Sequence, residues 1–189
     1  LDVSANTALT ALRCYDNPEL YCIQVADVDQ AEEDWVDDIS SWMVFSTDCE
    51  SYVPAMHVPD DNFEQALIDL GYDDTLDNYV VTDSINSVTS LDVGGKEISD
   101  LTGIEDFKAL EELSCSNNQL TTLDVSNNKA LTSLGCGNNL LTELDLSQNT
   151  ALENLQPYGN QLTSLDLSNH TALEKLRCFE NELTSLNLA

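Results

Sequence analysis

The sequence predicts an α/β solenoid, in which stacked repeats build a parallel β-sheet and small helical caps close the ends. Three observations between residues 110 and 188 support this prediction. A pattern of residues recurs every 21 positions without an insertion, and a period of this size is typical of solenoids. Leucine and asparagine each recur at fixed positions of the pattern, and cysteine recurs at a third. The columns are Leu113, Leu134, Leu155 and Leu176; Asn118, Asn139, Asn160 and Asn181; and Cys115, Cys136 and Cys178, with Pro157 as the exception.

Each repeat begins with Leu-x-x-Leu-x-Cys, which predicts a short strand whose second leucine and cysteine point to the same face. One strand buries little apolar surface, but stacked copies form a continuous core. The asparagine after each strand can bond the backbone of the turn, so its copies are expected to form a ladder. The second half, Leu-Thr-x-Leu-Asp-Leu-Ser-x-Asn, is expected on the convex side. There Asp124, Asp145 and Asp166 are expected to bond the backbone of neighbouring repeats. This pattern is the leucine-rich repeat, with its sheet on the concave face.

Residues 1–50 are predicted to be the last repeats and the C-terminal cap of a first array. The repeat pattern is present from Leu1 to Val25 and then stops. Residues 27–35 predict a short acidic helix with Asp27 as its N-cap, because acids near the first turn suit the helix dipole. Residues 42–45 predict a closing strand, since a solenoid must cover its last repeat.

Residues 51–58 are interpreted as a connector, and residues 59–87 as the helical N-terminal cap of a second array. Between residues 59 and 71, proline and acids at the start, apolar residues at helical spacing and a final glycine predict a helix. Residues 73–86 are expected to form an acidic turn region with about one helical turn. Residues 88–189 then hold about five repeats, of which the first is irregular and the last incomplete.

The order of these features resembles the internalin-type, cysteine-containing leucine-rich repeat proteins of bacterial surfaces. The similarity rests on the 21-residue repeats with their cysteine column. It also rests on the order Pro-Asp, helix, Leu-Gly, Val-Thr-Ser-Leu and Ile-Ser-Asp-Leu-Thr-Gly-Ile. It covers most of residues 55–189 and implies a secreted or cell-surface protein. The scaffold itself does not identify a partner, because it serves many.

The chain is strongly acidic, with 35 Asp and Glu residues, six Lys and Arg residues and a net charge of −29. No lysine or arginine lies between Arg13 and Lys96. Such a surface repels nucleic acid and anionic membranes, and it favours cations or basic partners. No apolar stretch is long enough to cross a membrane. We therefore expect no nucleic acid partner and no membrane insertion.

The six cysteines divide into two groups. Cys14 and the three cysteines of the second array lie in the strand column, where a thiol packs as a small hydrophobic side chain. A metal or disulfide within the column is the weaker alternative, because one cysteine per repeat offers no tetrahedral cage. Cys22 and Cys49 lie outside the column, at either end of the first cap. We expect them to form a disulfide in an exported protein.

An oxygen-rich cluster follows the predicted cap helix, and it includes Asp73, Asp77 and Asp83. Calcium accepts about six to eight oxygen ligands in irregular geometry. The spacing does not match an EF-hand loop, although internalin-type caps resemble a shortened EF-hand. A solvated turn is the default interpretation, and a structural calcium ion held by these three aspartates is the alternative. No other cofactor is expected.

No catalytic set is visible in the sequence. His57 lies in the predicted connector, and His170 takes the place of a ladder asparagine. Neither histidine has a serine or cysteine nucleophile at a catalytic spacing. The chain is therefore not expected to be an enzyme.

The repeats differ most at positions that point outwards from the strands, where a ligand would be recognised. Tyrosine and arginine are enriched in binding hot spots. The predicted ligand-binding residues are Tyr158, Arg177, Phe179, Lys175 and Gln156. Arg13 and Tyr15 are added from the first array, because they have the same arginine–aromatic spacing as Arg177 and Phe179.

These residues lead to two functional hypotheses. The first is an extracellular recognition or adhesion module that binds a protein or carbohydrate on the concave face. The alternative is a structural spacer within a larger surface protein, which binds nothing itself. Residues 1–4 and 186–189 have the same repeat phase, so both ends are expected to be uncapped. A fragment or a rearranged piece of a longer protein explains this, and head-to-tail association through open ends is a further alternative.

Overall fold

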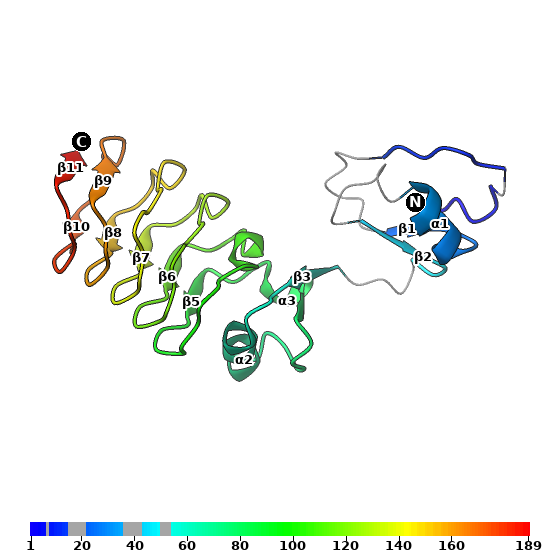
Figure 1. Cartoon of the computed structure of the whole chain (residues 1–189), viewed down its shortest axis with the longest axis horizontal. Helices are drawn as coiled ribbons and strands as arrows, with labels where there is room; N and C mark the ends of the chain where they lie inside the picture. Colours follow the sequence, from blue (N-terminus) through cyan, green and yellow to red (C-terminus); the bar gives the residue numbers. More distant parts are fainter. Residues whose placement is uncertain (7, 15–21, 36–42, 50–53) are drawn as a thin grey trace. The chain divides into compact units, whose positions relative to one another are not determined.

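The fold comes from a computed structural model of the chain (Figure 1), which describes residues 1–6, 8–14, 22–35, 43–49 and 54–189. The chain divides into two compact units, Leu1–Pro54 and Ala55–Ala189. Each unit has its own cluster of buried apolar residues. None of the helices in the described ranges combines the length and apolar composition that a membrane span requires.

The larger unit is a leucine-rich repeat solenoid with a parallel five-stranded sheet, whose strands follow one another along the array (Figure 1). Leucines stand opposite one another in the register of neighbouring strands. Leu134 and Leu155, in the middle of the sheet, have no exposed surface. The predicted core column and the parallel pairing are therefore confirmed. The strands are β5 Ser90–Asp92, β6 Glu112–Ser114, β7 Ser133–Gly135, β8 Asn154–Gln156 and β10 Lys175–Leu176.

A second, two-stranded parallel sheet forms in the second halves of the last repeats. It pairs β9 Ser164–Leu167 with β11 Ser185–Leu188. Leu165 and Leu167 of β9 are buried, so this edge of the repeat also faces the core.

Side-chain amides join consecutive repeats, as the asparagine column predicts. Nδ2 of Asn139 donates to the carbonyl oxygens of Cys115 and Cys136, both at 3.1 Å, and its Oδ1 accepts from the Leu120 N–H at 3.1 Å. Each amide therefore bonds backbone of its own repeat and of the preceding one, and most of these groups are buried. Equivalent bonds are made by Asn118, Asn160 and Asn181.

A second ladder runs along the other turn of the repeats. Asn128 and Asn149 have no exposed surface, and their Nδ2 atoms donate to backbone carbonyls at 2.8–3.1 Å. His170 takes the next position, with Nε2 3.1 Å from the carbonyl oxygen of Leu146. The histidine therefore replaces an asparagine as a structural hydrogen-bonding group.

The larger unit begins with a cap built around helix α2, Asp61–Asp69. Phe63, Ala66 and Leu67 pack into the core at helical spacing. Asp60 caps the helix, because its Oδ1 accepts from the Asn62 and Phe63 N–H groups at 3.0 Å. The predicted cap helix is therefore present, and its N-cap is an aspartate.

An antiparallel pair of short strands completes this cap and was not predicted. Strand β3, Ala55–His57, pairs antiparallel with β4, Tyr79–Val81, and α3, Thr82–Ile85, follows directly. Part of the stretch interpreted as a connector is thus a strand of the larger unit. Three-residue strands are too short to show an alternating pattern, so the sequence gives no periodicity to detect. A 3-10 turn, η2 at Ile104–Asp106, lies between the first two repeats.

The smaller unit pairs β1, Cys22–Gln24, in parallel with β2, Val44–Ser46, and Asp2 bridges to Gln24. Helix α1 spans Val28–Trp35, and Oδ1 of Asp27 accepts from the Gln30 N–H at 3.2 Å. The predicted acidic helix is therefore present, and β2 contains the last two residues of the predicted closing strand. Trp42 lies outside the described residues.

The structure forms the predicted disulfide between Cys22 and Cys49. The column cysteines remain thiols. Burial raises the pKa of Cys136 to about 12 and that of Cys115 well above its ordinary value. These two thiols therefore pack as core residues.

Candidate functional site on the concave face

The outward side chains of the five-stranded sheet form three columns that run across the strands. The central leucine of each strand points inwards, so the residues on either side of it point to the opposite face. This face, defined by the three columns, is the concave face. The columns are Ser90, Glu112, Ser133, Asn154 and Lys175; Asp92, Ser114, Gly135, Gln156 and Arg177; and Gly94, Ser116, Gly137, Tyr158 and Phe179.

Two aromatic rings stack at one end of the third column. The ring centroids of Tyr158 and Phe179 lie 5.0 Å apart, and their planes differ by 9°. Phe179 is 56% exposed, whereas Tyr158 is half-buried. A Cβ added to Gly137 would lie 2.5 Å from the Tyr158 ring. The glycine therefore gives the tyrosine ring the room it occupies, and Phe179 presents the more accessible ring.

A chain of hydrogen-bonded side chains crosses the strands beside the aromatic pair. Nδ2 of Asn154 donates to Oγ of Ser133 at 3.1 Å, and Nε2 of Gln156 donates to Oδ1 of Asn154 at 3.3 Å. Nη1 of Arg177 then donates to Oε1 of Gln156 at 3.3 Å. The guanidinium is thus held through its neighbours, and its fork of N–H donors suits a carboxylate or hydroxyl groups.

The two cations of this patch are open to a ligand. Lys175 and Arg177 are both exposed. Within the part of the chain that the structure describes, neither forms an ion pair, whereas Lys96 pairs with Asp69 and Lys108 with Asp106. An anionic group of a ligand would therefore meet no competing partner there.

The structure places five of the predicted ligand-binding residues together: Tyr158, Arg177, Phe179, Lys175 and Gln156. Arg13 belongs to the smaller unit, and Tyr15 lies outside the described residues. Ser133, Asn154 and Gly137 support this patch but were not among the predicted ligand-binding residues. Repeat phase places Ser133 and Gly137 at outward positions, but small or neutral residues give no further signal of a binding role.

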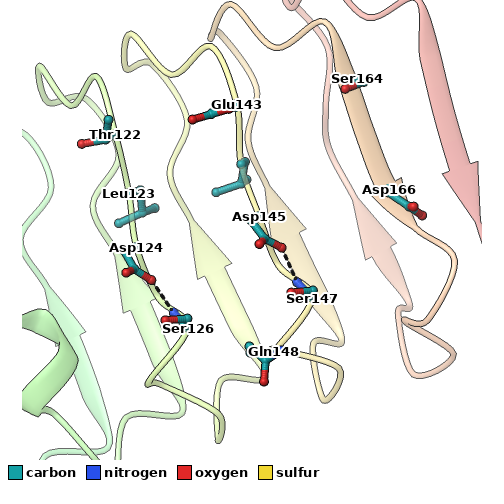
Figure 2. Close-up of a pocket in the computed structure, with 11 residues that line it drawn as sticks. Thr122, Leu123, Asp124, Ser126, Glu143, Asp145, Ser147, Gln148, Ser164 and Asp166 are labelled. Carbon is teal, nitrogen blue, oxygen red and sulfur yellow. Dashed lines mark hydrogen bonds between the residues drawn. The ribbon is translucent and has the colours of Figure 1, made fainter.

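A shallow hollow of about 710 Å³ lies over the second halves of the repeats, away from this patch (Figure 2). Figure 2 shows Asp124 and Asp145 turned towards Ser126 and Ser147. Oδ1 of each aspartate accepts from the serine N–H at 2.9 Å, and these bonds lower the pKa of both carboxyls. Asp166 bonds Ser168 in the same way. The expectation that these aspartates bond the backbone of neighbouring repeats is therefore wrong, because the backbone N–H that each one accepts belongs to its own turn.

The predicted calcium residues do not gather into one group. Asp83 lies in α3, where its Oδ1 accepts from the Asn86 side chain at 3.3 Å. No three His, Cys, Asp or Glu side chains in the described ranges are close enough together to hold a metal ion.

A buried glutamate of α2 lies beside two of the three predicted aspartates. Glu64 has no exposed surface, and its Oε1 accepts from the Asp77 and Tyr79 N–H groups at 2.9 and 3.2 Å. Oε2 of Glu64 and Oδ2 of Asp73 are buried without a hydrogen-bond partner. Burial, together with the negative charges of Glu64 and Asp77, raises the pKa of Asp73. These two orphaned oxygens suit a cation, so structural calcium stays a prediction, now centred on Glu64 and Asp73 and not on three carboxylates.

Comparisons with known proteins match the architecture. Over 73 residues the chain is 38% identical to internalin J of Listeria monocytogenes serotype 4b (strain F2365), which covers 37% of this chain and 8% of internalin J. The solved functional domain of InlJ from Listeria monocytogenes, which includes a cysteine ladder, has 34% identity and a TM-score of 0.61. It covers 71% of this chain and 33% of that one. No family model matches the chain.

A second solved structure is the internalin InlF from Listeria monocytogenes strain 4b F2365. It has 25% identity and a TM-score of 0.54, and the match covers 67% of this chain and 45% of that one. The resemblance to internalin-type leucine-rich repeat proteins is therefore confirmed, and the chain contains an internalin-like leucine-rich repeat domain. It spans less than half the length of each of these relatives.

Proposed function

We propose that the larger unit is a recognition or adhesion module of a secreted or cell-surface protein, and that it binds a protein or carbohydrate on the concave face. The observation that supports this most is the stack of Phe179 on Tyr158 beside two cations without ion-pair partners among the described residues. Aromatic and arginine side chains are the residues on which binding energy most often concentrates. The proposed role is binding, with no catalytic step.

The patch is built to be rigid before a ligand arrives. Gln156 holds Arg177, and Gly137 and Phe179 contact the Tyr158 ring on the same face. A side chain that is already ordered loses less conformational entropy when it binds. Phe179 could stack on a sugar ring or cover an apolar side chain, while Arg177 supplies paired donors.

The test begins with a screen of the protein against arrays of glycans and surface proteins. For a ligand found in this way, replacing both Tyr158 and Phe179 with alanine should weaken binding by more than about 1 kcal/mol. Tyr79→Ala is the matched control, because Tyr79 is 55% exposed on β4 of the same unit. Unchanged affinity in the double variant would place the ligand elsewhere and refute the proposed site, whereas a screen that yields no ligand would favour the structural spacer.

Gly137→Ala tests the same site without removing an aromatic ring. The new methyl group would occupy the space of the Tyr158 ring and force that ring to move. We expect weaker ligand binding with a thermal unfolding midpoint close to that of the wild type. Wild-type affinity in a folded Gly137→Ala variant would show that the position of the Tyr158 ring does not matter for binding.

A further inference from the structure

We propose that the concave face is a charge-polarised trough for an extended polypeptide segment that carries basic residues at one end and acidic residues at the other. This inference rests on the proposed function, because it names the class of partner for the same face. The outward residues of the five strands change from acidic to basic along the array. Two strands lie between the two ends, and the outward residues of the first, β7, are small.

The acidic end is formed by Asp92 on β5 and Glu112 on β6. Both side chains are exposed. Oδ1 of Asp92 accepts from the Gly94 N–H at 3.0 Å, and Oε2 of Glu112 accepts from the Ser90 hydroxyl at 3.3 Å. One oxygen of each carboxylate accepts a hydrogen bond that orients the group, and the other oxygen can accept from a basic group of a ligand. No lysine or arginine points outwards from these two strands.

The floor of the trough is β7. Its outward residues are Ser133 and Gly135, and Gly137 follows two residues after the strand ends. No long side chain therefore rises between Glu112 on one side and Tyr158 on the other. Removing side chains from a strand brings its backbone within reach of another backbone. A polypeptide with small residues in its middle could therefore lie against this strand.

The basic end is formed by Lys175 and Arg177 on the last strand of the sheet and in the residue after it. The chain has only six lysine and arginine residues, and two of them meet here. Gln156 orients Arg177, and neither cation is paired among the described residues. Phe179 adds an apolar surface next to them. The sign of the outward charges thus reverses across the sheet.

The spacing sets the length of the segment. Neighbouring strands lie about 4.8 Å apart, so the three strand steps from Glu112 to Lys175 span roughly 14 Å. An extended chain advances about 3.3 Å per residue, which places the basic and acidic groups of the ligand about four residues apart. A polypeptide readily carries both signs at this spacing. An acidic glycan carries only the negative one, which Asp92 and Glu112 would repel.

Two peptides of identical composition test this directly. One has arginines at one end, a glycine–serine spacer of about four residues and glutamates at the other end; the second has the opposite charges placed side by side. At low salt we expect the segregated peptide to bind about tenfold more tightly, because several exposed ion pairs form together. The difference should shrink as salt rises. Equal affinities, or tighter binding of a polyanionic glycan than of the segregated peptide, would overturn the inference.

Charge-neutralising variants locate the two ends. Glu112→Gln and Arg177→Gln should each reduce the preference for the segregated peptide at least about threefold. Lys108→Gln is the control and should leave this preference unchanged, because Lys108 pairs with Asp106. Arg177→Glu should reverse the sign of charge that the site binds at that end. The variant should therefore favour a peptide with arginines at both ends. If both neutralising variants keep the preference for the segregated peptide, the peptide does not bind across the concave face.

The outcomes separate this inference from the proposed function. If the peptides show no preference while the array ligand still depends on Tyr158 and Phe179, only the charge-polarised partner is wrong. If no ligand depends on any residue of the concave face, the proposed function fails as well.

Discussion

Asp60 joins the cap helix to the first repeat through a single carboxylate. Its Oδ1 caps α2, and its Oδ2 accepts from the Ser99 N–H at 2.9 Å, the Ser99 hydroxyl at 2.7 Å and the Asp100 N–H at 3.1 Å. Burial opposes ionisation, but the hydrogen bonds from Ser99, Phe63 and Asp100 outweigh it and lower the pKa of Asp60. The cap helix and the first repeat are therefore linked by a residue that must stay charged.

Asp60→Asn should lower the free energy of unfolding by about 1–3 kcal/mol near neutral pH, because an amide NH₂ cannot accept the bonds now made at one oxygen. The folded pKa of Asp60 lies below the unfolded value of 3.8, so its contribution is complete above 3.8 and is lost as the pH falls through the folded pKa. Urea unfolding across this range measures the change. The control is Asp61→Asn at an exposed helical position, and a destabilisation that does not shrink in acid would contradict the assignment.

Single residues were predictable where the repeat fixes their role. The asparagine ladder follows from spacing alone, since each copy meets the same backbone groups. Glu64 could not be anticipated, because a glutamate in an acidic amphipathic helix is normally exposed. It is buried because the chain after α2 folds back and donates the Asp77 and Tyr79 N–H groups to it. That contact depends on the unpredicted pairing of β3 with β4 rather than on any local pattern.

At the level of elements, the acidic stretch after α2 is the place where the folded chain accumulates like charges. The folded pKa of Asp73 is raised above 3.8, so ionising this carboxyl weakens the fold, and stability is lost as the pH rises through the folded pKa. Asp73→Asn should therefore raise the melting temperature at neutral pH, and this advantage should disappear in acid. Thermal unfolding followed by circular dichroism measures it. A variant no more stable than the wild type at neutral pH would show that the repulsion is already relieved.

Calcium addition tests whether a bound ion relieves the charge repulsion around Asp73. If an ion lies between Glu64 and Asp73, millimolar calcium should raise the melting temperature of the wild type, because it binds only the folded form. The Asp73→Asn variant should lose this response, whereas Asp83→Asn should keep it, since Asp83 bonds Asn86 within α3. If the melting temperature of the wild type changes with neither calcium nor chelator, the acidic stretch is a solvated turn without a bound ion.

The repeats and the caps differ in how well a sequence predicts them. Strands β6, β7, β8 and β10 recur at one period, so a wrong assignment in one copy can be recognised from the others. The antiparallel pair β3–β4 occurs once, has strands of three residues each, and joins segments more than 20 residues apart. The concave site is predicted less well than the repeats and better than the caps. Repeat phase predicts which residues face outwards, but the stacking of Phe179 on Tyr158 also depends on the absence of a side chain at Gly137.

At the level of the whole molecule, each unit has its own core and its own means of stabilisation. The larger unit relies on stacked leucines, with Leu134 fully buried at the centre of the sheet. The smaller unit has a short core, including Ile23, Ala31 and Phe45, and a disulfide that closes a loop with a sequence separation of 27. A small core needs such a covalent link more than a long array does. The two units should therefore respond to different perturbations.

Calorimetry can test this separation with one substitution and one reagent. Leu134→Ala should lower the stability of the larger unit by about 2–5 kcal/mol, because it leaves a cavity in the leucine column. A reductant should lower that of the smaller unit by about 2–4 kcal/mol by opening Cys22–Cys49, and it has no disulfide to open in the larger unit among the described residues. We expect two transitions, each shifted by one perturbation, with additive effects when both are applied. Leu140→Ala is the control for the array, because Leu140 is 46% exposed. A single transition that moves under both perturbations would mean that the two units unfold as one cooperative body.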